Sequence, residues 1–114
     1  MMLNGGLWRG KRLLSLAAVT DLTRPQTGEL KTGFVDGMSF GYGFAVVKEP
    51  AANTTRMLSS DTFGHGGAYG TQSWADPKRD LILVLMYQWS KVPNADASPM
   101  REAFQDAAVK ALVE

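Results

Sequence analysis

Residues 69–89 read YGTQSWADPKRDLILVLMYQW, and this stretch carries the best-defined local structure in the sequence. Over residues 69–75, small or polar residues alternate with aromatic ones, as is typical of a half-buried strand. Residues 76–80 carry turn chemistry, with Lys78 and Arg79 expected at a solvated tip, and residues 81–89 form an apolar run. The stretch therefore predicts an antiparallel hairpin whose second strand is buried.

Two helices are predicted, one before this hairpin and one after it. Ser15 is expected to cap a short helix over residues 16–23, and Pro25 is expected to end it. Ser98 and Pro99 are expected to begin a final helix, because serine favours the N-cap and proline the first helical position. Apolar residues at helical spacing predict the face with which this helix covers a sheet: Met100, Phe104, Ala108, Ala111 and Leu112.

The remaining segments complete an α+β fold. Residues 26–38 are typical of a polar loop, and residues 42–49 predict a further strand because they are rich in β-forming side chains. We therefore expect a partial antiparallel sheet of about three strands, covered by the C-terminal helix, in one domain over residues 1–114. So small a sheet has few ways to close its edges, which favours pairing with a second copy or with another chain.

Composition excludes several classes of function. Lys plus Arg number 12 and Asp plus Glu 11, so the net charge of +1 gives no electrostatic case for a nucleic-acid or membrane-surface partner. With no cysteine and one histidine, thiolate and multi-histidine metal sites are not expected, and no cofactor is implied. The longest apolar run, residues 81–87, is too short to span a membrane, and nothing in the sequence indicates a localisation.

A first candidate for chemistry is the G-x-S-x-G pattern at residues 37–41, which His65 follows in the chain. In a nucleophile elbow a strand precedes the serine and a helix follows it, so that a sharp turn exposes the hydroxyl. Here a loop is predicted before Ser39 and a strand after it, although Glu49 and Asp61 lie between Ser39 and His65 in the chain, where the acid of such a triad would stand. A glycine-rich entry into a strand produces the same pattern, so a small esterase using Ser39 and His65 is one alternative among others.

The second candidate is the run FGHGGAYG at residues 63–70, which leads into a predicted strand. Glycines in such a place allow unusual backbone angles and leave a strand edge bare enough for a ligand. A backbone N–H on that edge can donate to an oxyanion, and an imidazole can orient the bound group. A glycine-rich turn with a solvated histidine is the alternative interpretation of the same residues.

Five short pieces of sequence, in this order, resemble a known family. They are LNGG at 3–6, GKRLLS at 10–15, GYGF at 41–44, FGHGG at 63–67 and DPKRDL at 76–81, followed by the closing helix. Together they resemble the C-terminal part of the serine β-lactamase-like family, which comprises class C β-lactamases, D-Ala-D-Ala carboxypeptidases and related esterases. The resemblance runs over nearly the whole chain.

The resemblance implies an antiparallel sheet flanked by helices and an active site of three elements. These are an S-x-x-K that carries the acylated serine, a Tyr or Ser element that shuttles its proton, and a strand bearing K-T-G or H-x-G. His65-Gly66-Gly67 matches the last element. By the family pattern, His65, Gly66 and Gly67 would line the substrate, Ala68 would donate its backbone N–H to the oxyanion, and Tyr69 would line the pocket.

The other two elements are absent from this sequence. No serine is followed by lysine three residues later, and no tyrosine begins a Tyr-x-Asn. The family carries those elements upstream, so the resemblance implies that residues 1–114 correspond to about the last third of such an enzyme.

Two functions are therefore expected. The first is that of a C-terminal fragment of a serine hydrolase whose parent acts on a small acyl substrate (an ester, a β-lactam or a D-Ala peptide). Such a fragment would be inactive alone, because it lacks the nucleophile. The alternative is a non-enzymatic assembly domain or split-protein partner that uses exposed strand edges.

Overall fold

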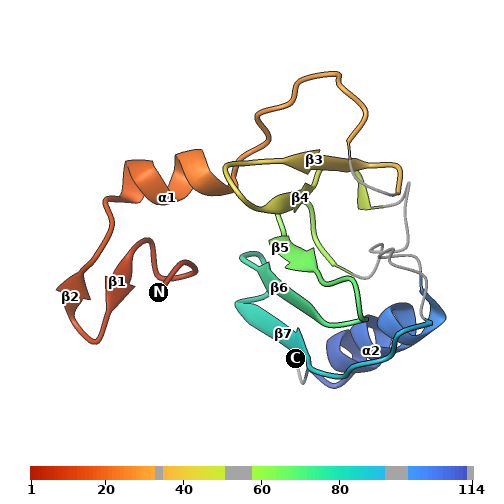
Figure 1. The fold of residues 1–114 in the computed structure, drawn as a ribbon. Helices are drawn as coiled ribbons and strands as arrows, with labels where there is room; N and C mark the ends of the chain where they lie inside the picture. The colour runs from red at the N-terminus through yellow and green to blue at the C-terminus, as the bar shows by residue number, and fades with distance from the viewer. Residues whose placement is uncertain (33–34, 51–57, 92–97, 113–114) are drawn as a thin grey trace.

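The computed structural model describes residues 1–32, 35–50, 58–91 and 98–112. Its elements are β1 (Leu7–Trp8), β2 (Lys11–Arg12), α1 (Leu16–Thr23), β3 (Met38–Phe40), β4 (Ala45–Val47), β5 (Phe63–Gly66), β6 (Gln72–Asp76), β7 (Leu81–Leu85) and α2 (Pro99–Lys110). The last five strands form one antiparallel sheet in the order β3-β4-β5-β6-β7, and β1 pairs with β2 separately (Figure 1). The predicted α+β fold is confirmed, with five strands in the main sheet where the sequence predicted about three.

The predicted hairpin is formed by β6 and β7. Their register places Trp74 opposite Leu83 and Ser73 opposite Val84. The pair Trp74 and Leu83 is buried, whereas Ile82 and Val84 of β7 are 59% and 51% exposed. The expectation that the second strand is buried therefore holds for one face only, since the other face of β7 is open among the described residues.

Local residue patterns did not predict β3 or β5, although the family resemblance implied a strand at His65-Gly66-Gly67; both strands contain or adjoin glycines. Gly64 lies on β5 opposite Trp74, and a Cβ atom there would lie 2.0 Å from the carbonyl oxygen of Ser73. A glycine at this place is therefore required by the close approach of β6, although glycine by itself disfavours a strand. The run 63–66 is consequently a strand that leads into a turn, not a loop that leads into a strand.

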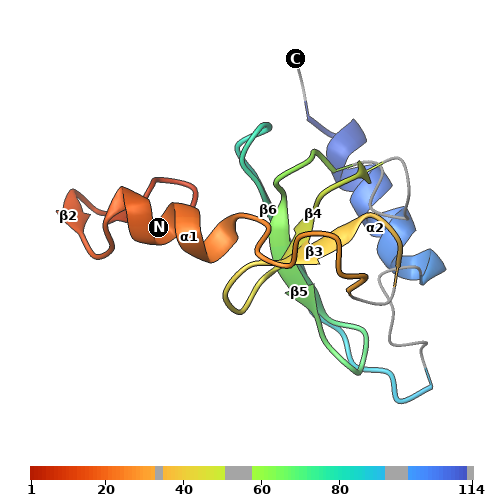
Figure 2. The same cartoon turned by 90° about the horizontal axis from the view of Figure 1, so that it is seen from above.

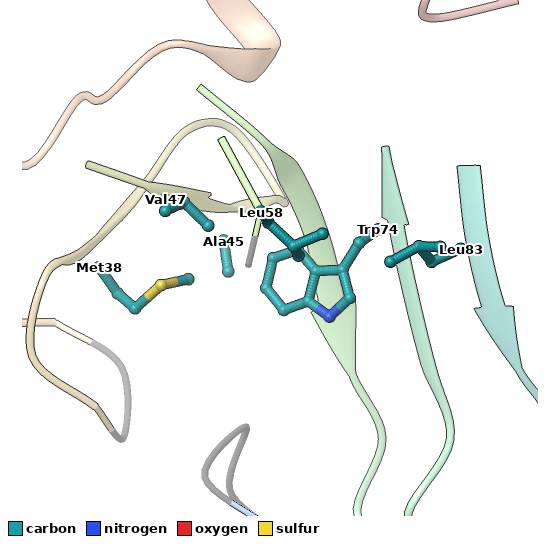
Figure 3. Packing of buried hydrophobic residues seen from close by; sticks show 6 residues of the cluster. All are labelled: Met38, Ala45, Val47, Leu58, Trp74 and Leu83. Carbon is teal, nitrogen blue, oxygen red and sulfur yellow. The ribbon is translucent and has the colours of Figure 1, made fainter. Parts of the chain in front are cut away.

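The hydrophobic core lies between one face of the sheet and α2. Six buried residues form its cluster: Met38, Ala45, Val47, Leu58, Trp74 and Leu83 (Figure 3). Phe104, Ala108 and Val109 of α2 pack against the cluster, and Figure 2 shows α2 on one side of the sheet. The predicted face of this helix is partly wrong, because Met100 and Leu112 are exposed while Arg101 and Gln105 are its buried residues.

The first helix has the predicted bounds, residues 16–23. The Ser15 hydroxyl accepts a hydrogen bond from the N–H of Ala18 at 3.0 Å, which is the N-cap that the sequence predicts. The N-terminal segment leads away from the sheet (Figures 1 and 2). It is joined to the β3–β4 turn by a hydrogen bond from the N–H of Tyr42 to the carbonyl of Leu22 at 3.0 Å.

The turn between β6 and β7 is anchored by a buried carboxylate, Asp76. Its Oδ1 accepts the N–H groups of Lys78 and Arg79, and its Oδ2 accepts the N–H of Ser59 and the Arg79 guanidinium, both at 2.9 Å. The prediction that Lys78 and Arg79 are simply solvated is therefore only partly correct. The Arg79 guanidinium binds Asp76, and the Lys78 ammonium lies 3.4 Å from Asp61. These contacts fix residues 59–61, the segment that leads into β5.

Neither helix in the described ranges combines the length and apolar character needed to cross a membrane.

Candidate functional site

The candidate site is the tight connection between β5 and β6. After β5, the N–H of Gly67 donates to the carbonyl of Thr71 at 2.7 Å, and the N–H of Gly70 donates to the carbonyl of Gly67 at 3.1 Å. A Cβ atom at Gly67 would lie 2.2 Å from the Thr71 hydroxyl, so the turn needs glycine there. These bonds leave Ala68 and Tyr69 at the exposed tip of the turn.

His65 lies on β5, opposite Ser73, with its side chain exposed. Its ring is 5.9 Å from that of Phe40, centroid to centroid, in an edge-on contact. Its Nδ1 lies 2.6 Å from the carbonyl oxygen of Gly66. A carbonyl oxygen only accepts hydrogen bonds, so Nδ1 is the donor of this contact.

The backbone N–H of Ala68 is available for a ligand. Over the ranges that the structure describes, no acceptor is found for it, and the residue is exposed. An exposed turn amide of this kind can donate to a developing negative charge on a bound group. The structure thus places the predicted residues His65, Gly66, Gly67, Ala68 and Tyr69 on one strand end and its turn.

A pocket of about 420 Å³ lies beside this turn. It is lined by Ala68, Tyr69, Thr71, Met86, Tyr87 and Gln88, none of which is charged. The N–H of Trp89 donates to the carbonyl of Tyr69 at 3.0 Å and so holds the chain after β7 against the turn. Met86 and Tyr87 were not among the site residues predicted from the sequence. Continuing the β6–β7 register beyond Gln72 and Leu85 brings Met86 opposite Thr71 and Tyr87 opposite Gly70.

The G-x-S-x-G pattern does not form a nucleophile elbow. Ser39 lies in the middle of β3 and is 1% exposed. Its hydroxyl is 2.7 Å from that of Thr27, with which it shares a hydrogen bond. An elbow requires a strand, a sharp turn and a helix around an exposed serine, and Ser39 has none of this geometry.

Comparison with known proteins shows the family of this chain. The family model described as Beta-lactamase matches residues 2–107. The chain belongs to the beta-lactamase family. This confirms the resemblance drawn from the five short pieces of sequence, which lie within the matched residues.

Two curated proteins are similar to this chain. They are "Uncharacterized protein MT1414" from Mycobacterium tuberculosis (strain CDC 1551 / Oshkosh) and "Protein Rv1367c" from Mycobacterium tuberculosis (strain ATCC 25618 / H37Rv). Each is 36% identical over 107 residues, which cover 86% of this chain and 27% of the relative. The chain therefore spans about a quarter of the length of these relatives.

Proposed function

We propose that this chain is the substrate-side part of a serine hydrolase of the beta-lactamase family. The parent reaction is acyl transfer to serine and then to water, from an ester, a β-lactam or a D-Ala-containing peptide. In this proposal Ala68 donates its N–H to the oxyanion, His65, Gly66 and Gly67 line the substrate, and Tyr69 forms one wall of the acyl pocket. The proposal rests on the N–H of Ala68, which has no acceptor among the described residues and lies beside an uncharged pocket of about 420 Å³.

The Ala68 amide would act on the intermediate of this reaction. When a serine oxygen bonds to the substrate carbonyl carbon, the carbonyl π pair moves to its oxygen, and an N–H donor stabilises the resulting anion. The pair then reforms the double bond as the leaving group departs with a proton, and water repeats the sequence on the acyl-serine. One such donor is worth about 10²–10³-fold in rate.

The nucleophile of that reaction is not in this sequence, because no serine here is followed by lysine three residues later. The proposal therefore holds that a segment resembling the rest of the family fold supplies it, and that residues 1–114 alone do not turn over. The 27% share of each relative's length supports this division.

The first prediction is that the purified chain does not react with a fluorophosphonate serine-hydrolase probe. None of its seven serines is followed by lysine three residues later, and Ser39 is buried, so the intact mass is expected to stay unchanged. Mass spectrometry before and after exposure is the measurement, with a trypsin sample as the positive control. A stoichiometric adduct that maps to Ser39 would contradict the proposal and favour a self-contained esterase.

The second prediction concerns substrate binding by the isolated chain. We expect N-acetyl-D-alanyl-D-alanine, benzylpenicillin or ethyl butyrate to shift the amide resonances of residues 65–69 in a ¹H–¹⁵N spectrum, with the largest shift at Ala68. Binding is expected to be weak, with a Kd of about 1 mM or above, because one backbone donor and one open pocket supply few contacts. Substitution Ala68→Pro removes the donor and should abolish the shift of its neighbours.

A matched control at the same position is Ala68→Ser, which keeps the N–H and the exposed side-chain position and should bind as the wild type does. If none of the three probes shifts residues 65–69, or if Ala68→Pro binds as well as Ala68→Ser, the proposed role of the turn is wrong.

An assembly role is the second candidate, and one observation favours it. In the described sheet β7 pairs with β6 alone, and residues 81–85 contain no proline or charged side chain to discourage a further strand. If assembly were the function of the chain, all three probes would leave the Ala68 resonance unmoved.

A further inference from the structure

A buried arginine lies beneath the candidate turn. Arg101 belongs to the first turn of α2 and is 1% exposed. Its Nε donates to the carbonyl of Gly70 at 3.1 Å, and its Nη2 donates to the carbonyls of Gly67 at 2.6 Å and Thr71 at 2.9 Å. One guanidinium therefore contacts three carbonyl oxygens of the turn, from a helix that lies 30 to 34 residues further along the chain.

This contact needs the shape of a guanidinium. Its N–H donors point outward in a rigid plane, so that Nε and Nη2 reach separate acceptors at the same time. A lysine ammonium is a compact charge and cannot span the same three oxygens. Hydrogen bonds from a charged donor are also about twice as strong as neutral ones.

The bond to Gly67 bears directly on the candidate oxyanion donor. The carbonyl of Gly67 and the N–H of Ala68 belong to one planar trans peptide group, so the two point in opposite directions. Because Arg101 binds the Gly67 oxygen on the α2 side, the Ala68 N–H is turned away from α2. The absence of an acceptor for that N–H among the described residues fits this orientation.

The same bond polarises the peptide group. A positive donor on a carbonyl oxygen draws electron density from the amide nitrogen, which makes its N–H a stronger donor. The buried position of Arg101 increases the effect, because the interaction is less screened than at the surface.

We propose that Arg101 is a positioning residue, which holds the Gly67–Ala68 peptide with its carbonyl toward α2 and its N–H toward the ligand, and which strengthens that N–H as a donor. The use of the N–H by a ligand rests on the proposed function, whereas the hold on the peptide does not.

The experiment compares the wild-type chain with Arg101→Lys and Arg101→Ala in ¹H–¹⁵N spectra. We expect the Ala68 proton to move upfield in both variants, more in Arg101→Ala, because the N–H is less polarised without the guanidinium. Affinity for N-acetyl-D-alanyl-D-alanine should fall about tenfold, as for the loss of one hydrogen bond. Addition of methylguanidinium to Arg101→Ala should restore the Ala68 resonance. The matched control is Lys110→Ala, because Lys110 is an exposed cation of the same helix. This substitution should change neither the Ala68 resonance nor the affinity for the probe.

Two results would overturn the inference: an Ala68 resonance in either folded variant that coincides with the wild type, or a shifted one that methylguanidinium does not restore. Because a variant can fail to fold, a wild-type measurement decides independently. A through-hydrogen-bond coupling between an Arg101 guanidinium nitrogen and the Gly67 carbonyl carbon is expected, and its absence would refute the contact. If the wild type binds no probe but shows this coupling, the proposed function fails and the positioning of the peptide stands.

Discussion

Substitution Trp74→Ala is expected to lower the free energy of unfolding by about 4 kcal/mol, the typical cost of removing a large aromatic side chain from a core. Trp74 is 1% exposed and lies at the centre of the buried cluster, between the sheet and α2. Its indole N–H donates to Oε1 of Gln72 at 2.9 Å, an oxygen that also accepts from Gln105 at the same distance. Urea unfolding followed by circular dichroism measures the loss.

Trp89→Ala is the matched control for this prediction, because the Trp89 side chain is 53% exposed and should cost about 0.5 kcal/mol or less. Trp74→Phe keeps one aromatic ring but removes the N–H and part of the indole volume, so its loss of stability should lie between zero and that of Trp74→Ala. If Trp74→Ala and Trp89→Ala lost equal stability, the core would not lie where the structure places it.

Substitution Asp76→Asn is expected to cost about 3 kcal/mol at neutral pH, as for removing one partner of a buried ion pair. Burial of the carboxyl acts to raise its pKa, but hydrogen bonds from Ser59 and Arg79 outweigh burial, so that its pKa lies below the usual value. Folding therefore favours the ionised carboxylate of Asp76 over its protonated form. This stabilisation is present above the unfolded pKa of about 3.9, and it is lost as the pH falls through the lower pKa of the folded state.

The measurement is the urea midpoint of wild type and Asp76→Asn between pH 7 and pH 2. We expect the difference between them to be largest at neutral pH and to shrink below about pH 4. Asp106→Asn, which breaks a partly exposed pair with Lys110, is the control and should cost about 0.5 kcal/mol or less. A difference that stays constant down to pH 2 would show that Asp76 is not ionised in the folded chain.

The elements with local signals could be predicted from the sequence. The bounds of α1 and the start of α2 agree with the structure because Ser15 and Ser98 cap their helices through their own hydroxyls. The β6–β7 hairpin was predicted because side-chain alternation and turn residues act over a few positions. Local residue patterns missed β3 and β5, because glycine weakens any local strand signal. Only the family resemblance implied a strand at His65-Gly66-Gly67, and the close approach of a neighbouring strand makes glycine necessary at Gly64.

Only part of the candidate site, likewise, could be predicted from the sequence. Residues 65–69 could be named from the sequence because they are contiguous and match one element of a known family pattern. Arg101 could not, since its position in the helix predicts a solvated charge and its partners are 30 or more residues away. The predicted apolar face of α2 was displaced for the same reason: Arg101 and Gln105 are buried by polar contacts that hydrophobic periodicity does not register.

The order of the strands in the sheet has a consequence for how the chain folds. Each strand from β3 to β7 pairs with its neighbour in sequence, so the sheet can grow strand by strand, with the largest loop-closure cost at the long connection between β4 and β5. The contacts of Arg101 with the 67–71 turn close a much longer loop, and they require the turn to exist already. We therefore expect α2 to dock after the β5–β6 turn has formed, and the Ala68 amide to take its final orientation only when α2 docks.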